Sequence, residues 1–261
     1  MFDKIPLLMF QWKIPRTPKN KKLFSDFSFS FPKDAMSATD ASFSDFALDG
    51  TQHFIHLRPI SDYTREHFLY LQSFVYLESK SAYFTRRQNY SSFLIQYTYE
   101  GSGILEYENK TYLLTPGTGF LIDCRKPHYY HTESTNWTHS DNGISADYFC
   151  QLWEKNGDIS FSIPKAEFQN ALENILYHYT NFSIERDFLV SNRLESLLLL
   201  LFHKRNESTM SSDKVIPENI RYLIKYMESN YAKPLTLDSL SAFAGISKFH
   251  LSREFKKYTG Q

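Results

Sequence analysis

The C-terminal part of the chain constrains its fold more than any other segment. Residues 236–243 and 247–258 each have a helical apolar pattern of only a few turns, and Gly245 lies between them. Thr236 and Ser247 stand just ahead of these patterns, where a hydroxyl oxygen caps the unpaired N–H groups of a first helical turn. The pattern predicts two short helices joined through a glycine turn, which is the helix-turn-helix layout.

The second of these helices has two chemically different faces. At about 100° per residue, Leu251, Phe255 and Tyr258 lie together and are expected to face a core. The opposite side carries an aromatic ring, a hydroxyl and two cations, on Phe249, Ser252, Arg253 and Lys256.

The outer face suits a DNA major groove. An arginine fork matches O6 and N7 of guanine, a hydroxyl bonds a base edge or a phosphate, and an aromatic ring packs on a thymine methyl group. An ordinary amphipathic helix with a solvated charged face is the alternative, but the preceding helix and turn favour groove binding. The expected DNA contacts are Thr236, Ser247, Lys248, Phe249, Ser252, Arg253, Lys256 and Lys257.

The distribution of charge agrees with this interpretation. The formal net charge of the chain is zero, yet residues 214–261 hold eight Lys and Arg against four acids, a net charge of +4. Residues 1–22 carry +5, so the segment between them carries −9. A basic C-terminal end on an acidic body is suggestive of a polyanionic partner, although ordinary surface variation also produces such numbers.

The middle of the chain predicts β structure and then helices. Aromatic residues make up 17% of the chain, and short strand-like segments follow one another between Ser91 and Thr132. Glu100 to Gly103 is interpreted as a turn between two of them. Short strands at near-even spacing predict a β-barrel or a sandwich.

Two helices are predicted after the strands, over about 164–182 and 185–203. Leu197 to Leu201 is apolar around nearly the whole second helix, so burial within the domain and a dimer interface are both open. Residues 1–66 show no sustained period and are interpreted as a loosely ordered extension or an appended strand.

The C-terminal segment resembles a known family of regulators. Pro-Leu-Thr-Leu-Asp-Ser-Leu at 234–240 and the run Ala-Gly-Ile-Ser-Lys-Phe-His-Leu-Ser-Arg-Glu-Phe-Lys-Lys-Tyr-Thr-Gly at 244–260 are similar to the first helix-turn-helix unit of AraC/XylS regulators. The resemblance implies that Phe249 and Arg253 reach the DNA. Ser241 departs from the alanine usual in the family, which requires that its hydroxyl be hydrogen-bonded.

The resemblance also implies a second helix-turn-helix unit, which this sequence does not contain. The chain ends at Gln261, where the family's linker helix should begin. A fragment and a naturally truncated gene both fit, and specific affinity for DNA should be reduced, because one unit reads one groove segment.

Residues 67–135 resemble the cupin-type barrel that this family places ahead of its DNA-binding part. Tyr97 to Gly103 is similar to the first cupin hairpin, and Gly117 to His128 to the second motif. Metal-binding cupins need a set of His and Glu ligands, but the corresponding first-motif positions hold Gln88, Tyr90 and Leu94. One remaining imidazole, on His128, does not make a catalytic metal site. We therefore expect no metal, no cofactor and no catalytic residues, and a small-molecule pocket instead. The residues expected to bind the effector are Tyr97, His128 and Tyr130.

These observations combine into one predicted organisation of class α+β. It consists of a poorly defined extension (1–66), a cupin-like effector-binding barrel (67–163), a helical dimerisation and linker region (164–205) and a partial helix-turn-helix domain (214–261). The predicted function is an effector-responsive, sequence-specific regulator that binds double-stranded DNA as a homodimer, with a sugar as the effector class frequent in the family.

Two alternatives of other classes remain: a cupin enzyme acting on a small molecule such as a sugar, and a truncated protein that only dimerises and so interferes with a full-length relative.

The sequence also bears on the compartment. Cys124 and Cys150 make neither a disulfide framework nor a CxxC metal pair. The N-terminus lacks the layout of a secretion signal, and the longest apolar run, Leu197 to Phe202, falls well below the ~20 residues that cross a bilayer. We expect a cytoplasmic protein with no membrane partner.

Overall fold

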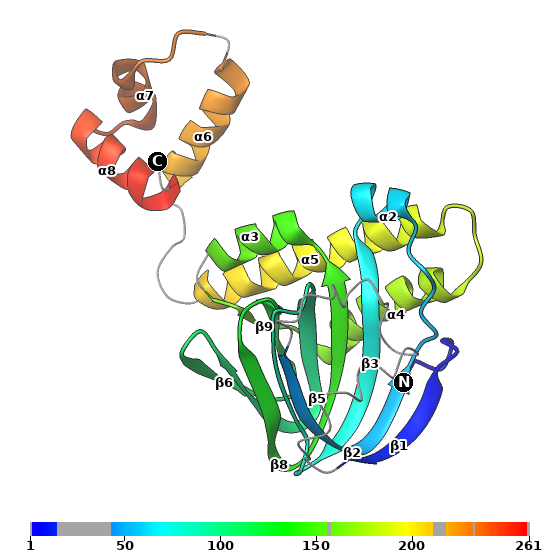
Figure 1. The fold of residues 1–261 in the computed structure, drawn as a ribbon. Helices are drawn as coiled ribbons and strands as arrows, with labels where there is room; N and C mark the ends of the chain where they lie inside the picture. The colour runs from blue at the N-terminus through cyan, green and yellow to red at the C-terminus, as the bar shows by residue number, and fades with distance from the viewer. Residues whose placement is uncertain (1, 15–42, 156–157, 211–217, 232, 260–261) are drawn as a thin grey trace. The chain divides into compact units, whose positions relative to one another are not determined.

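The computed structural model describes residues 2–14, 43–155, 158–210, 218–231 and 233–259. They form two compact units, Met1–Ser208 and Thr209–Gln261. The first contains a curved β-sheet with helices packed on it, and the second is entirely helical (Figure 1). The predicted α+β class is confirmed. None of the helices in the described ranges is long and apolar enough to span a membrane.

Nine strands of the first unit form one antiparallel sheet. They are β1 (Leu8–Ile14), β2 (Phe43–Phe54), β3 (Tyr70–Lys80), β4 (Phe84–Gln88), β5 (Phe93–Tyr107), β6 (Lys110–Leu114), β7 (Thr118–Asp123), β8 (His128–Ser145) and β9 (Ser160–Ser162). The main order is β1-β2-β3-β8-β5-β7-β9, while β4 pairs with β2 and β8, and β6 pairs with β5.

The strands β3 and β4 lie end to end and form one long, interrupted strand of the barrel wall. One end of β2 pairs with β4 and its other end with β3. The two parts of β8 do the same, with β4 and then β3. The strands β7 and β6 are arranged in the same way along β5. The resulting sheet is strongly curved, as Figure 1 shows.

The strand β5 runs straight through the segment that the sequence analysis interprets as a turn, so that interpretation is wrong. The register of β5 against β8 shifts on both sides of Gly101, which has a φ of +70°. A Cβ atom at this position would come within 2.0 Å of the Asn136 carbonyl oxygen. The glycines therefore provide a β-bulge that bends a continuous strand around the barrel.

Part of the N-terminal segment belongs to the sheet. Of the two interpretations of residues 1–66, the structure favours appended strands, because β1 pairs with β2 from Leu8↔Phe54 to Ile14↔Leu48. The barrel thus begins well before residue 67. The strand β8 likewise extends to Ser145, beyond the strand-like segments recognised between Ser91 and Thr132.

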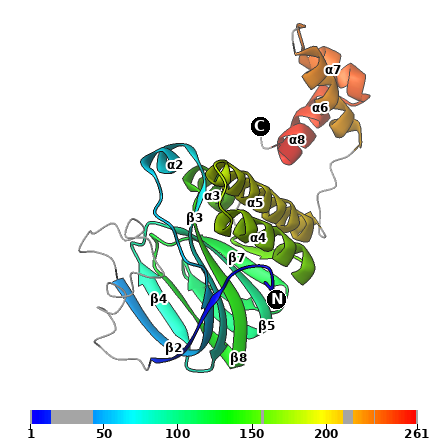
Figure 2. The ribbon, with the colours of Figure 1, turned by 90° about the vertical axis from the view of Figure 1, so that its right-hand side faces the viewer.

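Helices cover one face of the barrel wall. They are α2 (Asp62–His67), α3 (Asp147–Lys155), α4 (Lys165–Thr180) and α5 (Arg186–Met210), and Figures 1 and 2 show α3, α4 and α5 side by side along the barrel. Because side chains alternate along each strand, the wall has two cores. One lies between the sheet and the helices, and the other lies inside the barrel.

Both helices predicted after the barrel are present, as α4 and α5. Leu197, Leu198 and Leu201 are buried in the helix-facing core, whereas Leu199 is exposed. The all-round apolar pattern therefore overstates the burial of α5, and one side of the helix remains open.

The second unit contains the two predicted helices of the helix-turn-helix and a helix that precedes them. They are α6 (Glu218–Asn230), α7 (Leu237–Ala244) and α8 (Lys248–Thr259). Ile220, Leu223 and Leu251 form the centre of their small core, against which Phe255 packs. The side chains of Tyr258 and Lys257 lie outside the described part, so the expected core contact of Tyr258 stays a prediction.

Candidate functional site

The turn between α7 and α8 has the predicted cap chemistry. Thr236 and Ser239 form a capping box, in which the Ser239 N–H donates to Thr236 Oγ1 at 3.2 Å and the Thr236 N–H donates to Ser239 Oγ at 3.1 Å. Gly245 ends α7 with a φ of +67°, the left-handed conformation that glycine adopts without strain. Ser247 Oγ accepts the N–H of His250 at 3.2 Å and starts α8. These contacts fix the angle between the two helices.

The hydroxyl of Ser241 is hydrogen-bonded, as expected for a serine at the position where the resembled family usually has alanine. Ser241 is buried, and its Oγ donates to the Asp238 carbonyl oxygen at 3.0 Å. The substitution therefore leaves the helix pair intact.

The outer face of α8 is free of packing. Phe249 is 80% exposed, and Ser252, Arg253 and Lys256 are exposed as well. An exposed ring beside a hydroxyl and two cations provides the groups that the predicted groove contacts need. The structure brings these four predicted DNA contacts together on one side, opposite Leu251.

Some cations of α8 are already paired with neighbouring side chains. Arg253 Nη2 donates to His250 Nδ1 at 3.0 Å, and its Nε lies 3.5 Å from Glu254 Oε1. Lys248 is paired with Asp238 across the turn. A phosphate contact from Lys248 would therefore compete with an ion pair that holds α7 to α8. Lys256 makes no hydrogen bond or ion pair with the described residues. The predicted contact through the Lys257 side chain lies outside the described residues.

The barrel encloses a pocket with a cavity volume of about 110 Å³. Its apolar lining includes the side chains of Trp12, Ile14, Phe46, Leu48, Val75, Leu77, Tyr90 and Leu94. Its hydrogen-bonding groups belong to Gln52, Ser73, Tyr83, Thr85, Arg87, Ser92, Cys124, Tyr130 and Asp141. A largely apolar surface with a few convergent polar groups is typical of a ligand site.

Asp141 is the acidic group of this pocket. Its Oδ2 accepts the hydroxyl of Tyr130 at 2.9 Å, while its Oδ1 accepts no hydrogen bond from the described residues. Burial raises the pKa of Asp141 to about 6. A buried carboxylate oxygen that faces a cavity without a donor is satisfied by a donor from a ligand or from water.

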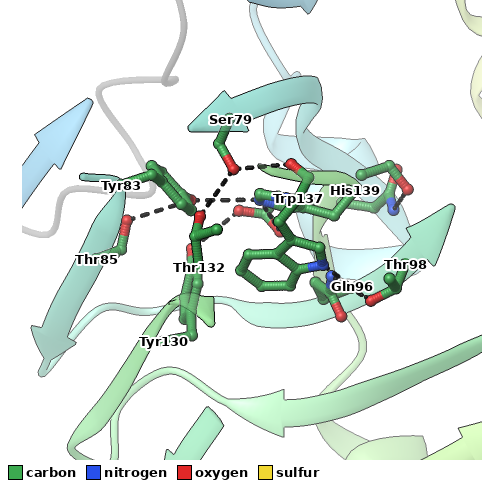
Figure 3. Close-up of polar contacts among 12 residues, drawn as sticks. Ser79, Tyr83, Thr85, Gln96, Thr98, Tyr130, Thr132, Trp137 and His139 are labelled. Atoms are coloured by element: carbon green, nitrogen blue, oxygen red, sulfur yellow. Dashed lines mark hydrogen bonds and ion pairs between the residues drawn. The ribbon is translucent and has the colours of Figure 1, made fainter. Parts of the chain in front are cut away.

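A buried polar network backs the pocket wall (Figure 3). His139 Nε2 lies 3.4 Å from Tyr83 Oη and 3.9 Å from Asp141 Oδ1. The ring of His139 stacks on Trp137 with centroids 3.9 Å apart, and Trp137 Nε1 donates to Thr98 Oγ1 at 3.1 Å. Burial lowers the pKa of His139 to about 3, so this imidazole is neutral at physiological pH.

The three residues predicted to bind the effector lie in different places. Tyr130 lines the pocket. Tyr97 instead belongs to the helix-facing core, where it stacks on Phe168 at 4.3 Å and donates to the Ile163 carbonyl oxygen at 2.9 Å. His128 lies at the edge of a shallower surface hollow, and its Nδ1 lies 2.9 Å from the Lys126 carbonyl oxygen. Burial lowers the pKa of His128 to about 4.

The sequence analysis missed most of the pocket. Trp12 lies in the N-terminal segment, Arg87 lies on the short strand β4, and Asp141 lies in the second half of β8. The alternation Trp137, His139, Asp141 was a usable signal, because residues two apart share one face of a strand.

The positions that correspond to cupin metal ligands hold no ligand set. Gln88 lies at the end of β4, and Tyr90 and Leu94 line the pocket. No group of three His, Cys, Asp or Glu side chains among the described residues is arranged to hold a metal ion.

Comparisons with known proteins match both units. A model of the AraC-like ligand-binding domain matches residues 71–202, and a model of the bacterial regulatory helix-turn-helix proteins of the AraC family matches residues 227–261.

Two relatives are regulators. The lactose operon transcription activator of Staphylococcus xylosus is 23% identical over 168 residues, which cover 62% of this chain and 60% of the relative. The uncharacterised HTH-type transcriptional regulator YbfI of Bacillus subtilis (strain 168) is 23% identical over 186 residues, which cover 64% of each chain. The matches thus span less than two thirds of these relatives.

A solved structure also matches most of the chain. The AraC-like transcriptional activator CuxR aligns with 95% of this chain and 89% of its own, at 12% identity and a TM-score of 0.42.

Proposed function

The chain belongs to the AraC family of bacterial transcriptional regulators, and we propose from this membership that it is an effector-responsive regulator that binds specific DNA sequences. The observation that carries the proposal is the outer face of α8. It presents Phe249, Ser252, Arg253 and Lys256 to solvent on a helix that Thr236 and Gly245 fix against its neighbour. A groove-reading helix needs this combination of an exposed polar face and a rigid entry angle.

The test is DNA binding by the full chain across a salt series. A duplex is first selected from a random library with the unmodified protein, and its affinity is compared with that of a scrambled duplex by fluorescence anisotropy. Arg253→Ala should weaken the selected duplex by about 1–3 kcal/mol and leave the scrambled one nearly unchanged, because base contacts specify and phosphate contacts do not. Lys256→Ala should weaken both duplexes and reduce the salt slope by about 1.

Lys225→Ala provides the charge-matched control, since Lys225 is an exposed cation on α6, outside the helix pair. Equal loss on both duplexes with Arg253→Ala would mean that Arg253 contacts only the backbone. Absence of salt-dependent binding would contradict DNA reading by this chain and favour a protein that acts by dimerisation alone.

The effector proposed for the barrel is a sugar. Sugars expose hydroxyl groups around an apolar ring face, and the pocket offers aromatic rings next to the Asp141 carboxylate and Arg87. The unsatisfied Oδ1 of Asp141 requires a donor, which a sugar hydroxyl supplies. The similarity to a lactose operon activator makes lactose and its component hexoses the first ligands to test.

Isothermal titration with lactose, galactose and glucose measures this binding directly. Asp141→Asn should reduce the affinity by about tenfold to hundredfold, because a hydrogen bond to a charged group contributes roughly 1.5–3 kcal/mol. Asp62→Asn removes an exposed carboxylate on α2 and should leave the affinity unchanged. Equal sugar affinities of Asp141→Asn and Asp62→Asn would contradict a role for Asp141 in sugar binding.

The assembly proposed for the protein is a homodimer formed through α4 and α5. Phe188 and Leu199 are exposed and are 11 residues apart, close to three full turns, so they lie on one side of α5. Analytical ultracentrifugation should show a dimer that Leu199→Asp shifts toward monomer, while Tyr148→Asp, the same kind of change on the exposed side of α3, does not. A monomer at tens of micromolar would contradict this part of the proposal.

A further inference from the structure

The helix α3 lies in the chain between β8, which lines the pocket, and β9, which pairs with β7. It begins at Asp147, immediately after β8, the strand that carries Asp141 and Gly143 of the pocket lining. The chain continues beyond α3 to β9, which pairs with β7. The Leu121 N–H of β7 also donates to the Ile159 carbonyl oxygen at 3.0 Å. The two ends of α3 are therefore linked to β8 and, through β9, to β7, the strand that ends next to the pocket residue Cys124.

The start of α3 is tied to the pocket by a salt bridge as well. Arg125 Nε donates to both carboxylate oxygens of Asp123 at 2.9 Å, and its Nη1 donates to Asp147 Oδ1 at 2.9 Å. Asp123 precedes Cys124, whose buried side chain lines the pocket. These bonds thus connect the first turn of α3 to the segment between β7 and β8 at the pocket wall.

The end of α3 is held by a buried arginine from α5. Arg205 is 3% exposed, and its Nη1 donates at 2.8 Å to the carbonyl oxygens of both Trp153 and Asp158. Trp153 lies in the last turn of α3, where carbonyl groups lack partners within the helix. One guanidinium therefore satisfies the end of α3 and the segment that leads into β9.

Aromatic packing makes the same connection. The Arg205 guanidinium lies 4.0 Å from the ring centroid of Trp153 and 5.1 Å from that of Phe202. Trp153 is fully buried and also contacts Phe161 of β9. Burying a guanidinium is costly, and an apolar side chain of similar length would fill the same space more cheaply, so simple packing does not account for an arginine here.

We propose that Arg205 is a positioning residue that couples the pocket to the end of α5, the helix from which the chain leaves the first unit. In this arrangement α3 transmits displacements of β7 and β8, and Arg205 passes them to the last turns of α5. The inference rests on the proposed effector-responsive function, because it specifies how occupancy of the pocket reaches the segment before the DNA-binding unit.

Hydrogen exchange of the full chain, read by mass spectrometry without DNA or effector, tests the coupling. Cys124→Met places extra volume in the pocket and stands in for an occupant. It should change exchange in residues 199–205 at least threefold in the chain that retains Arg205. Combined with Arg205→Met, it should change exchange there by less than 1.5-fold, while its effect on the pocket strands persists.

Lys204→Met is the matched control, because it removes a cation from the adjacent position of α5. It should leave the response to Cys124→Met intact. Arg205→Lys, which retains the charge and one nitrogen able to donate to both carbonyl oxygens, should restore part of the response. If hydrogen exchange in β3 shows that Arg205→Met does not fold, Arg205→Lys replaces it in the comparison.

Two results would overturn the inference. One is a response of residues 199–205 that is equal with and without Arg205, and the other is no response in the chain that retains it although the pocket strands respond. Both are distinct from failure of the proposed function, which would show as loss of specific DNA binding in the salt series.

Discussion

The two faces of strand β5 lie side by side in sequence and yet have opposite chemistry. Ile95 and Tyr97 face the helices in an apolar core, and the Tyr97 hydroxyl donates a hydrogen bond to the Ile163 carbonyl oxygen. Gln96 and Thr98 face the barrel interior, are fully buried, and bond to each other at 3.3 Å. The helix-facing side is sealed by packing, whereas the interior holds polar groups beside a cavity.

The difference separates stability from recognition within one strand. Apolar contacts against α4 stabilise the unit without specificity for a ligand. Buried polar groups are costly unless satisfied, so a polar interior is retained where it has something to bind. Substitutions on the two faces should therefore differ in the size and in the pH dependence of their effects.

The largest effect is expected on the helix-facing side. Phe168→Ala removes the ring that stacks on Tyr97 and should lower the free energy of unfolding by about 3–5 kcal/mol, since it leaves a cavity in a packed core. Tyr177→Ala, on the exposed side of the same helix, should cost under about 1 kcal/mol. Denaturant unfolding followed by circular dichroism measures both, and equal losses would show that this core does not dominate stability.

The titratable side chains of the barrel interior should make the free energy of unfolding depend on pH. Burial lowers the pKa of His139 to about 3 and that of His128 to about 4, so both bind protons more readily when unfolded. The stability that these two neutral histidines contribute is lost as the pH falls from about 6.5 toward these pKa values. Asp141 has its pKa raised to about 6, so below that pH it favours the folded state and opposes the two histidines.

With two histidines against one carboxyl group, stability should fall by roughly 2–3 kcal/mol between pH 7 and pH 5. His139→Gln should flatten this fall, whatever it does to stability at pH 7. Unfolding midpoints recorded at each pH give the slope directly, and an unchanged slope would mean that His139 is not the group that titrates.

The smallest effect concerns the hydroxyl that Tyr130 donates. Tyr130→Phe leaves Asp141 Oδ2 without its partner and should cost about 1–2 kcal/mol at pH 7, and less below pH 6, where the carboxyl group is protonated. Tyr129→Phe, the neighbour on the other face of β8, serves as the control and should change stability by under about 0.5 kcal/mol. A loss that does not diminish at low pH would contradict the role assigned to this hydrogen bond.

The helix-turn-helix unit could be read almost entirely from sequence, because its geometry is local. Thr236, Gly245 and Ser247 act through contacts within three or four residues, and the faces of α8 follow from its period alone. The barrel was harder. Its strands were recognised, but Gly101 was interpreted as the site of a turn, since a bulge and a turn have the same glycine signature.

The pocket depended on information that no short segment contains. Trp12, Arg87 and Asp141 are far apart along the chain and meet only because the curved sheet places β1, β4 and β8 around one interior. Tyr97 was assigned to the effector site and lies on the opposite face, because a shift of one residue exchanges the two faces of a strand.

The sequence by itself determined the family, the α+β class and the exposed polar face of α8, all of which depend on local periods, caps and motifs. The tertiary structure alone decided which polar side chains share the barrel interior and that Arg205 joins α3 to α5. Those contacts link segments that are distant in sequence, and long-range pairing is specified by the closure and register of the whole sheet rather than by any residue's own preference.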